Sequence, residues 1–74
     1  MLLKFQAYRD GRWWGARAVG HSIFTQGRTL DELYRNIKEA AHLHFKEKVE
    51  AGEKIEIMIM TDAEVHLGRK AAAG

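Results

Sequence analysis

The sequence predicts an α+β domain in which a three-stranded antiparallel meander is followed by one helix and one further strand. Three observations lead to this fold class. Apolar and polar residues alternate in three short segments before residue 27, a helical apolar spacing begins at residue 29, and alternation returns in 54–61. The order is therefore βββαβ, and we expect the helix to pack on one face of the sheet. A chain of 74 residues has room for one domain, which we assign to residues 1–62, with 63–74 as a frayed C-terminal tail.

The first two expected strands, 2–9 and 12–19, form a hairpin. The Asp10-Gly11 pair between them favours a type I′ turn, in which both central positions need positive φ. Alternation divides the side chains of each strand between two faces of the sheet. The residues expected on the face that the helix covers are Leu3, Phe5, Trp14 and Ala16.

A third strand, 23–26, follows a turn at 20–22 and leads into the helix through Gly27. Glycine at this point can adopt the positive φ that a tight exit from a strand often requires. Thr29 stands three residues before Glu32, which is the spacing of a capping box, where each side chain bonds the other's backbone N–H. The helix should therefore begin at Thr29 or at the residue after it.

The helix is expected to extend from Thr29 to about Val49 and to end before Gly52, because glycine is common just after a helix. Its apolar stripe consists of Leu30, Leu33, Tyr34, Ile37, Ala40 and Ala41. His44 and Lys48 fall near the centre of the same stripe, and such residues seldom lie unpaired in a core. We therefore expect the last turns to overhang the sheet edge or to meet a partner.

The last strand, 54–61, places its three isoleucines on the face that the helix is expected to cover. The opposite face then carries large apolar and aromatic side chains, and a monomer rarely exposes a contiguous patch of that size. We expect this face to form the interface of a homo-oligomer, in the first place a dimer. The expected interface residues are Leu2, Tyr8, Trp13, Phe24, Met58 and Met60. In the competing interpretation, the chain is a monomer in which Trp13 and Met60 lie flat at the sheet rim.

The sequence lacks the patterns of catalytic and metal-binding sites. It contains no cysteine, which excludes disulfides and thiolate metal sites. His42 and His44 lie about 200° apart around a helix, so they cannot bind one ion together. His21 and Ser22 are adjacent, which is not the geometry of a nucleophile and its base. We therefore expect a protein that is not an enzyme and that binds no cofactor or metal.

Apolar runs in the sequence are short. None reaches the roughly 18 residues needed to cross a bilayer, and the N-terminus alternates with polar residues instead of forming a secretory signal. We therefore expect a soluble protein without membrane contact. The absence of cysteine fits the reducing cytoplasm, where we expect the protein to reside.

Charged residues are distributed unevenly along the chain. The first 28 residues carry five basic side chains and one acidic one, and the remainder carries seven basic and nine acidic ones, so the sheet is basic and the helical half acidic. The basic residues are too few for the stripe typical of nucleic-acid-binding proteins, and we do not expect nucleic acid as the main partner. Single-stranded RNA binding by the sheet stays open as the alternative, with aromatic rings stacking on bases and arginines contacting phosphates. The residues assigned to these contacts are Trp13, Phe24, Arg12 and Arg17.

Four segments around the strand-to-helix junction resemble the N-terminal domain of HicB-like antitoxins. They are Trp13-Trp14-Gly15-Ala16, Ile23-Phe24-Thr25-Gln26-Gly27, Thr29-Leu30-Asp31-Glu32-Leu33 and Asn36-Ile37-Lys38-Glu39-Ala40. The resemblance covers roughly residues 3–60 and implies a partial ribonuclease H-like βββαβ fold that lacks the catalytic carboxylates of the nuclease. It also implies inhibition by direct binding of a small HicA-like toxin that cleaves mRNA.

Three features depart from the family pattern. His21-Ser22 stand where the family usually has Pro-Gly, and Arg28 replaces an acidic residue after the glycine. The third is the expected absence of a C-terminal DNA-binding segment, so autorepression is not expected and the chain could be a solitary member without a toxin. Any toxin partner should be small and basic, because the acidic helical half would steer it. The residues expected to face it are Arg28, Asp31, Glu32 and His44.

Overall fold

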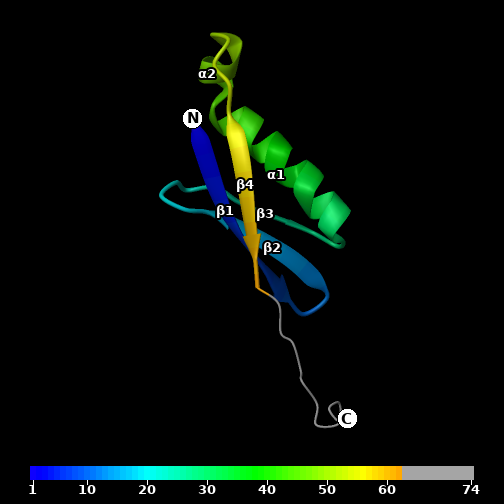
Figure 1. The fold of residues 1–74 in the computed structure, drawn as a ribbon. Coiled ribbons are helices and arrows are strands. Elements are labelled where there is room, and N and C mark those ends of the chain that lie inside the picture. Colours follow the sequence, from blue (N-terminus) through cyan, green and yellow to red (C-terminus); the bar gives the residue numbers. More distant parts are fainter. Residues whose placement is uncertain (63–74) are drawn as a thin grey trace, which may run out of the picture.

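The computed structural model describes residues 1–62 and shows an α+β fold in which one main helix packs on a four-stranded mixed sheet (Figure 1). The elements are β1 (Leu2–Asp10), β2 (Trp13–Ala18), β3 (Phe24–Gly27), α1 (Leu30–His44), α2 (Lys46–Glu50) and β4 (Glu56–Thr61). The fold class and the order of the strands and the main helix are confirmed, and the short α2 is an addition to the expected order. The tail expected at 63–74 lies outside the described residues.

The sheet has the strand order β3-β2-β1-β4. β1 pairs with β2, and β2 pairs with β3, in antiparallel register, which is the expected meander. After the helices, the chain returns to the other side of β1, where β4 pairs in parallel and Leu3 lies opposite Ile57. The addition of β4 makes the sheet mixed and leaves β4 as an edge strand.

The turn between β1 and β2 differs from the expected type I′ geometry. Asp10 pairs with Trp13, so the two loop residues are Gly11 and Arg12. Positive φ occurs at Gly11, at 64°, and not at Arg12. Positive φ at the first central position alone is the pattern of a type II′ turn. The Asp-Gly pair thus predicts the hairpin correctly, but the central residues of the turn are Gly11 and Arg12 instead of Asp10 and Gly11.

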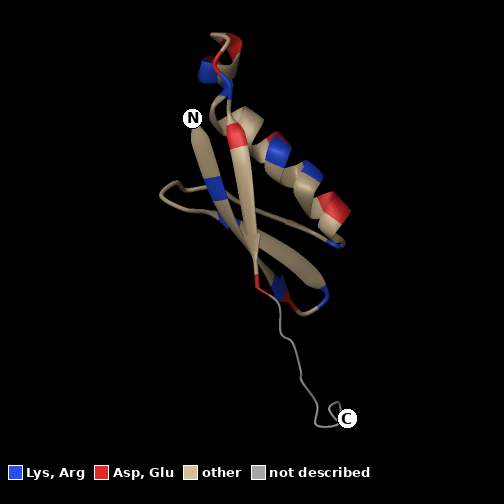
Figure 2. Ribbon diagram, viewed as in Figure 1, with Lys and Arg blue, Asp and Glu red and all other residues tan. Residues whose placement is uncertain are grey.

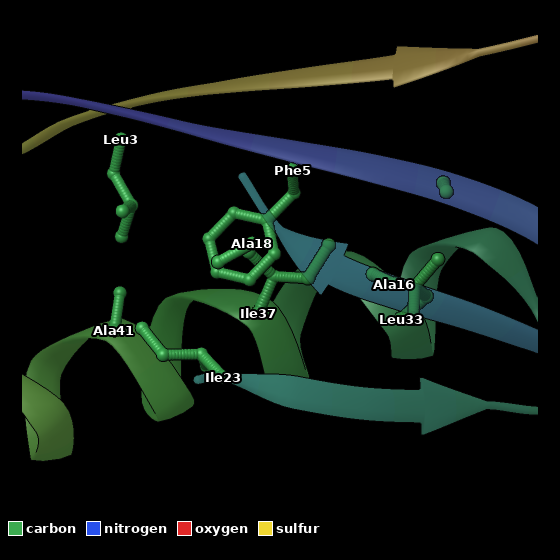
Figure 3. Close-up of a cluster of buried hydrophobic side chains, with 9 residues drawn as sticks. Leu3, Phe5, Ala16, Ala18, Ile23, Leu33, Ile37 and Ala41 are labelled. Atoms are coloured by element: carbon green, nitrogen blue, oxygen red, sulfur yellow. The ribbon is translucent and has the colours of Figure 1, made fainter. Parts of the chain in front are cut away.

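The core lies between α1 and the face of the sheet that alternation assigns to it (Figure 3). Phe5 of β1 and Ile37 of α1 are fully buried, and the small Ala16 and Ala18 of β2 let the helix approach the sheet. The buried hydrophobic residues are Leu3, Phe5, Ala7, Ala16, Ala18, Ile23, Leu33, Ile37 and Ala41. Trp14 and the isoleucines of β4 pack against this core and are only partly buried.

The junction between β3 and α1 is held by hydrogen bonds and by close packing. Thr29 Oγ1 accepts a hydrogen bond from the Glu32 N–H at 3.1 Å, as the capping box predicts. The Glu32 carboxylate accepts from the Arg28 N–H at 2.5 Å, one residue before the N-cap position expected for that bond. The expected positive φ at Gly27 is wrong. Glycine is required there because an added Cβ would lie 2.6 Å from the Leu33 backbone nitrogen.

The helix is interrupted at Phe45, so the single helix expected to reach Val49 is wrong. α1 ends at His44, and Phe45 lies between the two helices with φ −112° and ψ 36°. The Phe45 ring packs against the core and lies edge-on to His21, with 5.2 Å between ring centroids. A straight helix would carry His44 and Lys48 along the apolar stripe, whereas the interrupted helix leaves both side chains exposed.

Candidate interaction surface

No element among residues 1–62 covers the sheet face opposite α1 (Figure 1). Because Leu3 and Phe5 of β1 are buried in the core, the residues that alternate with them point to the opposite face. The register continues this face onto β4, where Met58 lies opposite Lys4. We call this surface the open face. Its main residues are Leu2, Lys4, Gln6, Tyr8, Trp13, Arg17, Phe24, Met58 and Met60.

All six residues predicted as an oligomer interface lie on the open face. Phe24 is 59% exposed, Leu2 49% and Met58 45%. Tyr8 and Met60 are half-buried, although no element among the described residues lies over them. The structure therefore brings the predicted residues together on one surface. Their participation in an oligomer stays a prediction.

Polar side chains interrupt the apolar ones on the open face. Phe24 lies opposite Arg17, Arg17 lies opposite Gln6, and Gln6 lies opposite Met60, which makes one row across all four strands. In this row the two apolar residues stand at the sheet edges, and the two polar ones lie between them. The open face is thus a mixed surface, in which separate apolar groups are bordered by cations and amides.

Two arginines lie over aromatic rings on or beside the open face. Arg17 Cζ is 5.5 Å from the ring centroid of Tyr8, and Arg28 Cζ is 5.3 Å from the ring centroid of Trp13. Both distances are within the range of cation–π contacts. The Tyr8 ring lies across Gly15, where an added Cβ would be 2.7 Å from the ring. Glycine and arginine thus hold the tyrosine ring close to the sheet.

Basic side chains lie on the strands of the meander and also on both helices (Figure 2). Lys4 and Arg17 point to the open face, and the acidic Asp10 and Glu56 stand at strand ends. A hollow of about 350 Å³ is lined by Arg12, Trp13 and Arg28. Figure 2 shows acidic residues at the start of α1, in α2 and at the start of β4. The open face therefore combines aromatic and cationic side chains.

The four residues predicted to face a partner lie in two separate places. Arg28, Asp31 and Glu32 are at the start of α1, and His44 is at its end, about 21 Å away along the helix axis. The Glu32 carboxylate is engaged by the Arg28 N–H. His44 lies edge-on to Phe45, with 4.8 Å between ring centroids. These local contacts account for Glu32 and His44, and contact with a partner stays a prediction.

Sequence reasoning missed an opening on the helix side of β4. A groove of about 530 Å³ lies there, lined by Lys38, Ala41, His42, Val49, Glu53, Ile55, Ile57 and Ile59. The isoleucines expected under the helix are only half-buried, because α1 packs over β3 and β2. A helix about 10 Å wide covers about two strands that are about 4.8 Å apart. Comparing these widths would have indicated that one helix cannot cover all four strands of the sheet.

Within residues 1–62, no group of three or more His, Cys, Asp or Glu side chains is placed to hold one metal ion. The helices of this described part are also too short and too polar to cross a membrane. Three surfaces of the described part are candidates for function: the open face, the start of α1 and the groove beside β4.

Over a short stretch, the chain is similar to a UPF0150 protein from Archaeoglobus fulgidus. The two are 56% identical over 32 residues, which is 43% of this chain and 48% of that protein. The match therefore spans about half the length of this curated relative. No family model and no solved structure matches the chain. The name of the relative states no activity, so the similarity alone assigns no function.

Proposed function

We propose that this chain is a HicB-like antitoxin-type protein-binding module, which neutralises a small HicA-like mRNA-cleaving toxin by direct binding, or is a solitary member of that family. The observation that carries the proposal is the open face, where no element among residues 1–62 covers the aromatic and apolar side chains that all four strands present. Tryptophan, tyrosine, phenylalanine and methionine are enriched at protein interfaces. A binding role would bury these aromatic and apolar side chains against a partner, with the cations and amides between them available for polar contacts.

The residues of the HicB-like resemblance support the proposal at the β3–α1 junction. Gly27 packs against the first turn of α1, the Thr29 hydroxyl accepts from the Glu32 N–H in that turn, and the Glu32 carboxylate accepts from the Arg28 N–H just before the helix. Together, these contacts fix the start of α1 against the end of β3. They explain why this combination of residue types would accompany this fold.

Two surfaces serve binding in this proposal. The open face binds a partner or a further copy of the chain. The acidic residues Asp31, Glu39 and Glu47 are exposed on the helices, and they steer a basic toxin by long-range attraction. Arg28 lies next to this acidic first turn. HicB-like proteins usually have an acidic residue at this position, so we expect Arg28 to change which partner is bound.

The decisive experiment is co-expression with the open reading frame adjacent to the gene for this chain. We expect the neighbour alone to arrest growth and to degrade mRNA, and co-expression of this chain to restore growth. The two proteins should copurify. A neighbour that is neither toxic nor bound by this chain would overturn the antitoxin proposal.

A pair of charge variants tests the steering surface. Asp31→Lys should lower the rate of toxin association several-fold at low salt, because it reverses a charge beside the proposed contact. Glu50→Lys changes the net charge equally on the exposed surface of α2 and is the matched control. Equal slowing by both variants would mean that only the net charge matters, and would contradict a contact at the start of α1.

The arginine–aromatic pairs favour one second candidate, a single-stranded RNA-binding module that uses the open face. Arg17 beside Tyr8 and Arg28 beside Trp13 place cations next to rings, which is the chemistry that stacks bases and meets phosphates. Fluorescence anisotropy with oligouridylate at about 50 mM and about 200 mM salt tests it. RNA binding should weaken with salt and should weaken again in Arg17→Gln. Absence of binding at the lower salt concentration would eliminate this candidate.

A further inference from the structure

We propose that two copies of this chain pair through the free edge of β4, antiparallel to each other, so that one continuous sheet runs through both copies. β4 stands at the end of the strand order β3-β2-β1-β4. One side of β4 pairs with β1, and no strand within residues 1–62 lies on its other side. The pairing rests on the geometry of this strand and does not depend on the antitoxin-type function.

The hydrogen bonds at the start of β4 show which of its backbone groups are free. The N-terminal amine of Met1 donates to the Lys54 carbonyl at 2.9 Å, and the Glu56 N–H donates to the Met1 carbonyl at 2.8 Å. Backbone groups of successive residues in a strand point to opposite sides, so the even-numbered residues bond β1. The N–H and C=O groups of Ile57 and Ile59 therefore face outward, where another strand can bond them.

The opposite edge of the sheet is protected, whereas no element among residues 1–62 covers the outer edge of β4. β3 has only four residues, and the Asn36 side chain of α1 donates from Nδ2 to the Gln26 carbonyl at 2.7 Å. β4 has six residues and contains no proline or lysine, which are residues that commonly block edge pairing. Its side chains are apolar on both faces from Ile57 to Met60. Such an edge is a template for another strand, and a second copy supplies an identical edge.

Charge selects one register for the antiparallel pair. With the twofold axis through Met58, Lys54 lies opposite Asp62 of the second copy, and symmetry forms this pair twice. Both side chains are exposed, so they are free to meet across the pair. An axis through Ile59 would instead place Glu56 opposite Asp62 of the second copy, which brings like charges together. An axis through Ile57 would place Lys54 opposite Met60 of the second copy, so that no opposite charges would meet at either end of the paired strands.

The same register joins apolar side chains on both faces of the sheet. On the helix side, Ile57 lies opposite Ile59 of the second copy, so isoleucines that line the groove of about 530 Å³ pack side by side. On the open face, Met58, which is 45% exposed, meets Met58 of the second copy. Cross-strand contacts of this kind stabilise sheets. One association thus satisfies the free backbone groups and covers apolar side chains on both faces.

A single cysteine tests the register directly, because the chain contains no cysteine. The backbone groups of Met58 point to β1, so residue 58 of each copy forms a non-hydrogen-bonded pair with Cα atoms about 4.5 Å apart, which suits a disulfide. We expect Met58→Cys to form a disulfide-linked dimer on air oxidation. Phe24→Cys is the matched control, because Phe24 is on the same face and more exposed, at 59%, but lies on β3. The control variant should form little linked dimer.

The wild-type full chain should have twice its 8.5 kDa mass by light scattering. Lys54→Glu should weaken the dimer about tenfold, because both attractive pairs become repulsive, and adding Asp62→Lys should restore it. A chain that stays monomeric at high micromolar concentration would overturn the pairing. So would equal crosslinking of the two cysteine variants, a dimer whose Met58→Cys variant does not crosslink, or a double charge variant that dimerises no more tightly than Lys54→Glu.

Discussion

The backbone of Gly27 lies against the backbone of Leu33, so that a Cβ added at Gly27 would be 2.6 Å from the Leu33 nitrogen and 2.9 Å from its Cα. Leu33 is fully buried and stands in the first turn of α1. The contact therefore sets how closely the helix approaches the end of β3. If β3 and α1 moved apart at this junction, Leu33 would lose its packing in the core.

Gly27→Ala should destabilise the protein by about 1–3 kcal/mol, because the added methyl group must displace backbone atoms. Urea unfolding followed by circular dichroism measures the change. Gly15→Ala is the control, since the atoms it would meet belong to the Tyr8 side chain, which can rotate away. We expect the control to cost less, and an equal loss in both variants would contradict the close-packing account of Gly27.

Thr29→Ala should cost about 1 kcal/mol of unfolding free energy, because the Glu32 N–H loses the side-chain oxygen that caps α1. Thr29→Ser keeps that oxygen and should stay within a few tenths of a kcal/mol of the wild type. Chemical denaturation of the three proteins under identical conditions provides the comparison. If serine proves as destabilising as alanine, the methyl group of Thr29 matters and the cap does not.

Local patterns predicted most of the fold because the interactions behind them are local. The alternation of Leu3 and Phe5 with polar residues reports which side of β1 faces the core, and the structure confirms it. The spacing of Thr29 and Glu32 reports a helix start, because their hydrogen bonds join residues within one turn. The same alternation predicted that the open-face residues share one face of the sheet, and the strand register confirms this.

The features that the sequence did not predict depend on contacts between distant residues. The helix is interrupted where Phe45 meets His21, and these residues belong to different elements. The parallel pairing of β4 joins Leu3 to Ile57 across most of the chain. The groove beside β4 arises from the relative widths of a helix and a sheet, which no hydrophobic period encodes.

Phe45→Ala should destabilise the protein by about 1–2 kcal/mol, less than the loss of a fully buried phenylalanine, because Phe45 is half-buried. The loss should be largest locally, since the Phe45 ring contacts His21 in the turn between β2 and β3. Amide hydrogen exchange should therefore accelerate at Ala18, whose N–H donates to the Ile23 carbonyl across this turn, before it does in β1. Phe45→Leu retains most of the apolar volume and is the control. Uniform acceleration across the sheet would contradict a local role for the ring.

Arg17 and Gly15 should be energetically coupled through Tyr8, because the tyrosine ring lies across the glycine and beneath the guanidinium. Arg17→Lys replaces the guanidinium over the ring with a smaller, more strongly hydrated ammonium group and should cost about 0.5–1 kcal/mol. In a Gly15→Ala background, the Tyr8 ring is already displaced, so the same substitution should cost much less.

A double-mutant cycle in urea measures this coupling, and the ring chemical shifts of Tyr8 report its displacement independently. Arg28→Lys combined with Gly15→Ala is the matched control, because Arg28 lies over Trp13 and not over Tyr8. The control pair should be additive. Additive costs for Arg17→Lys and Gly15→Ala would instead show that the tyrosine ring does not transmit the contact, and that the arginine and the glycine stabilise the open face separately.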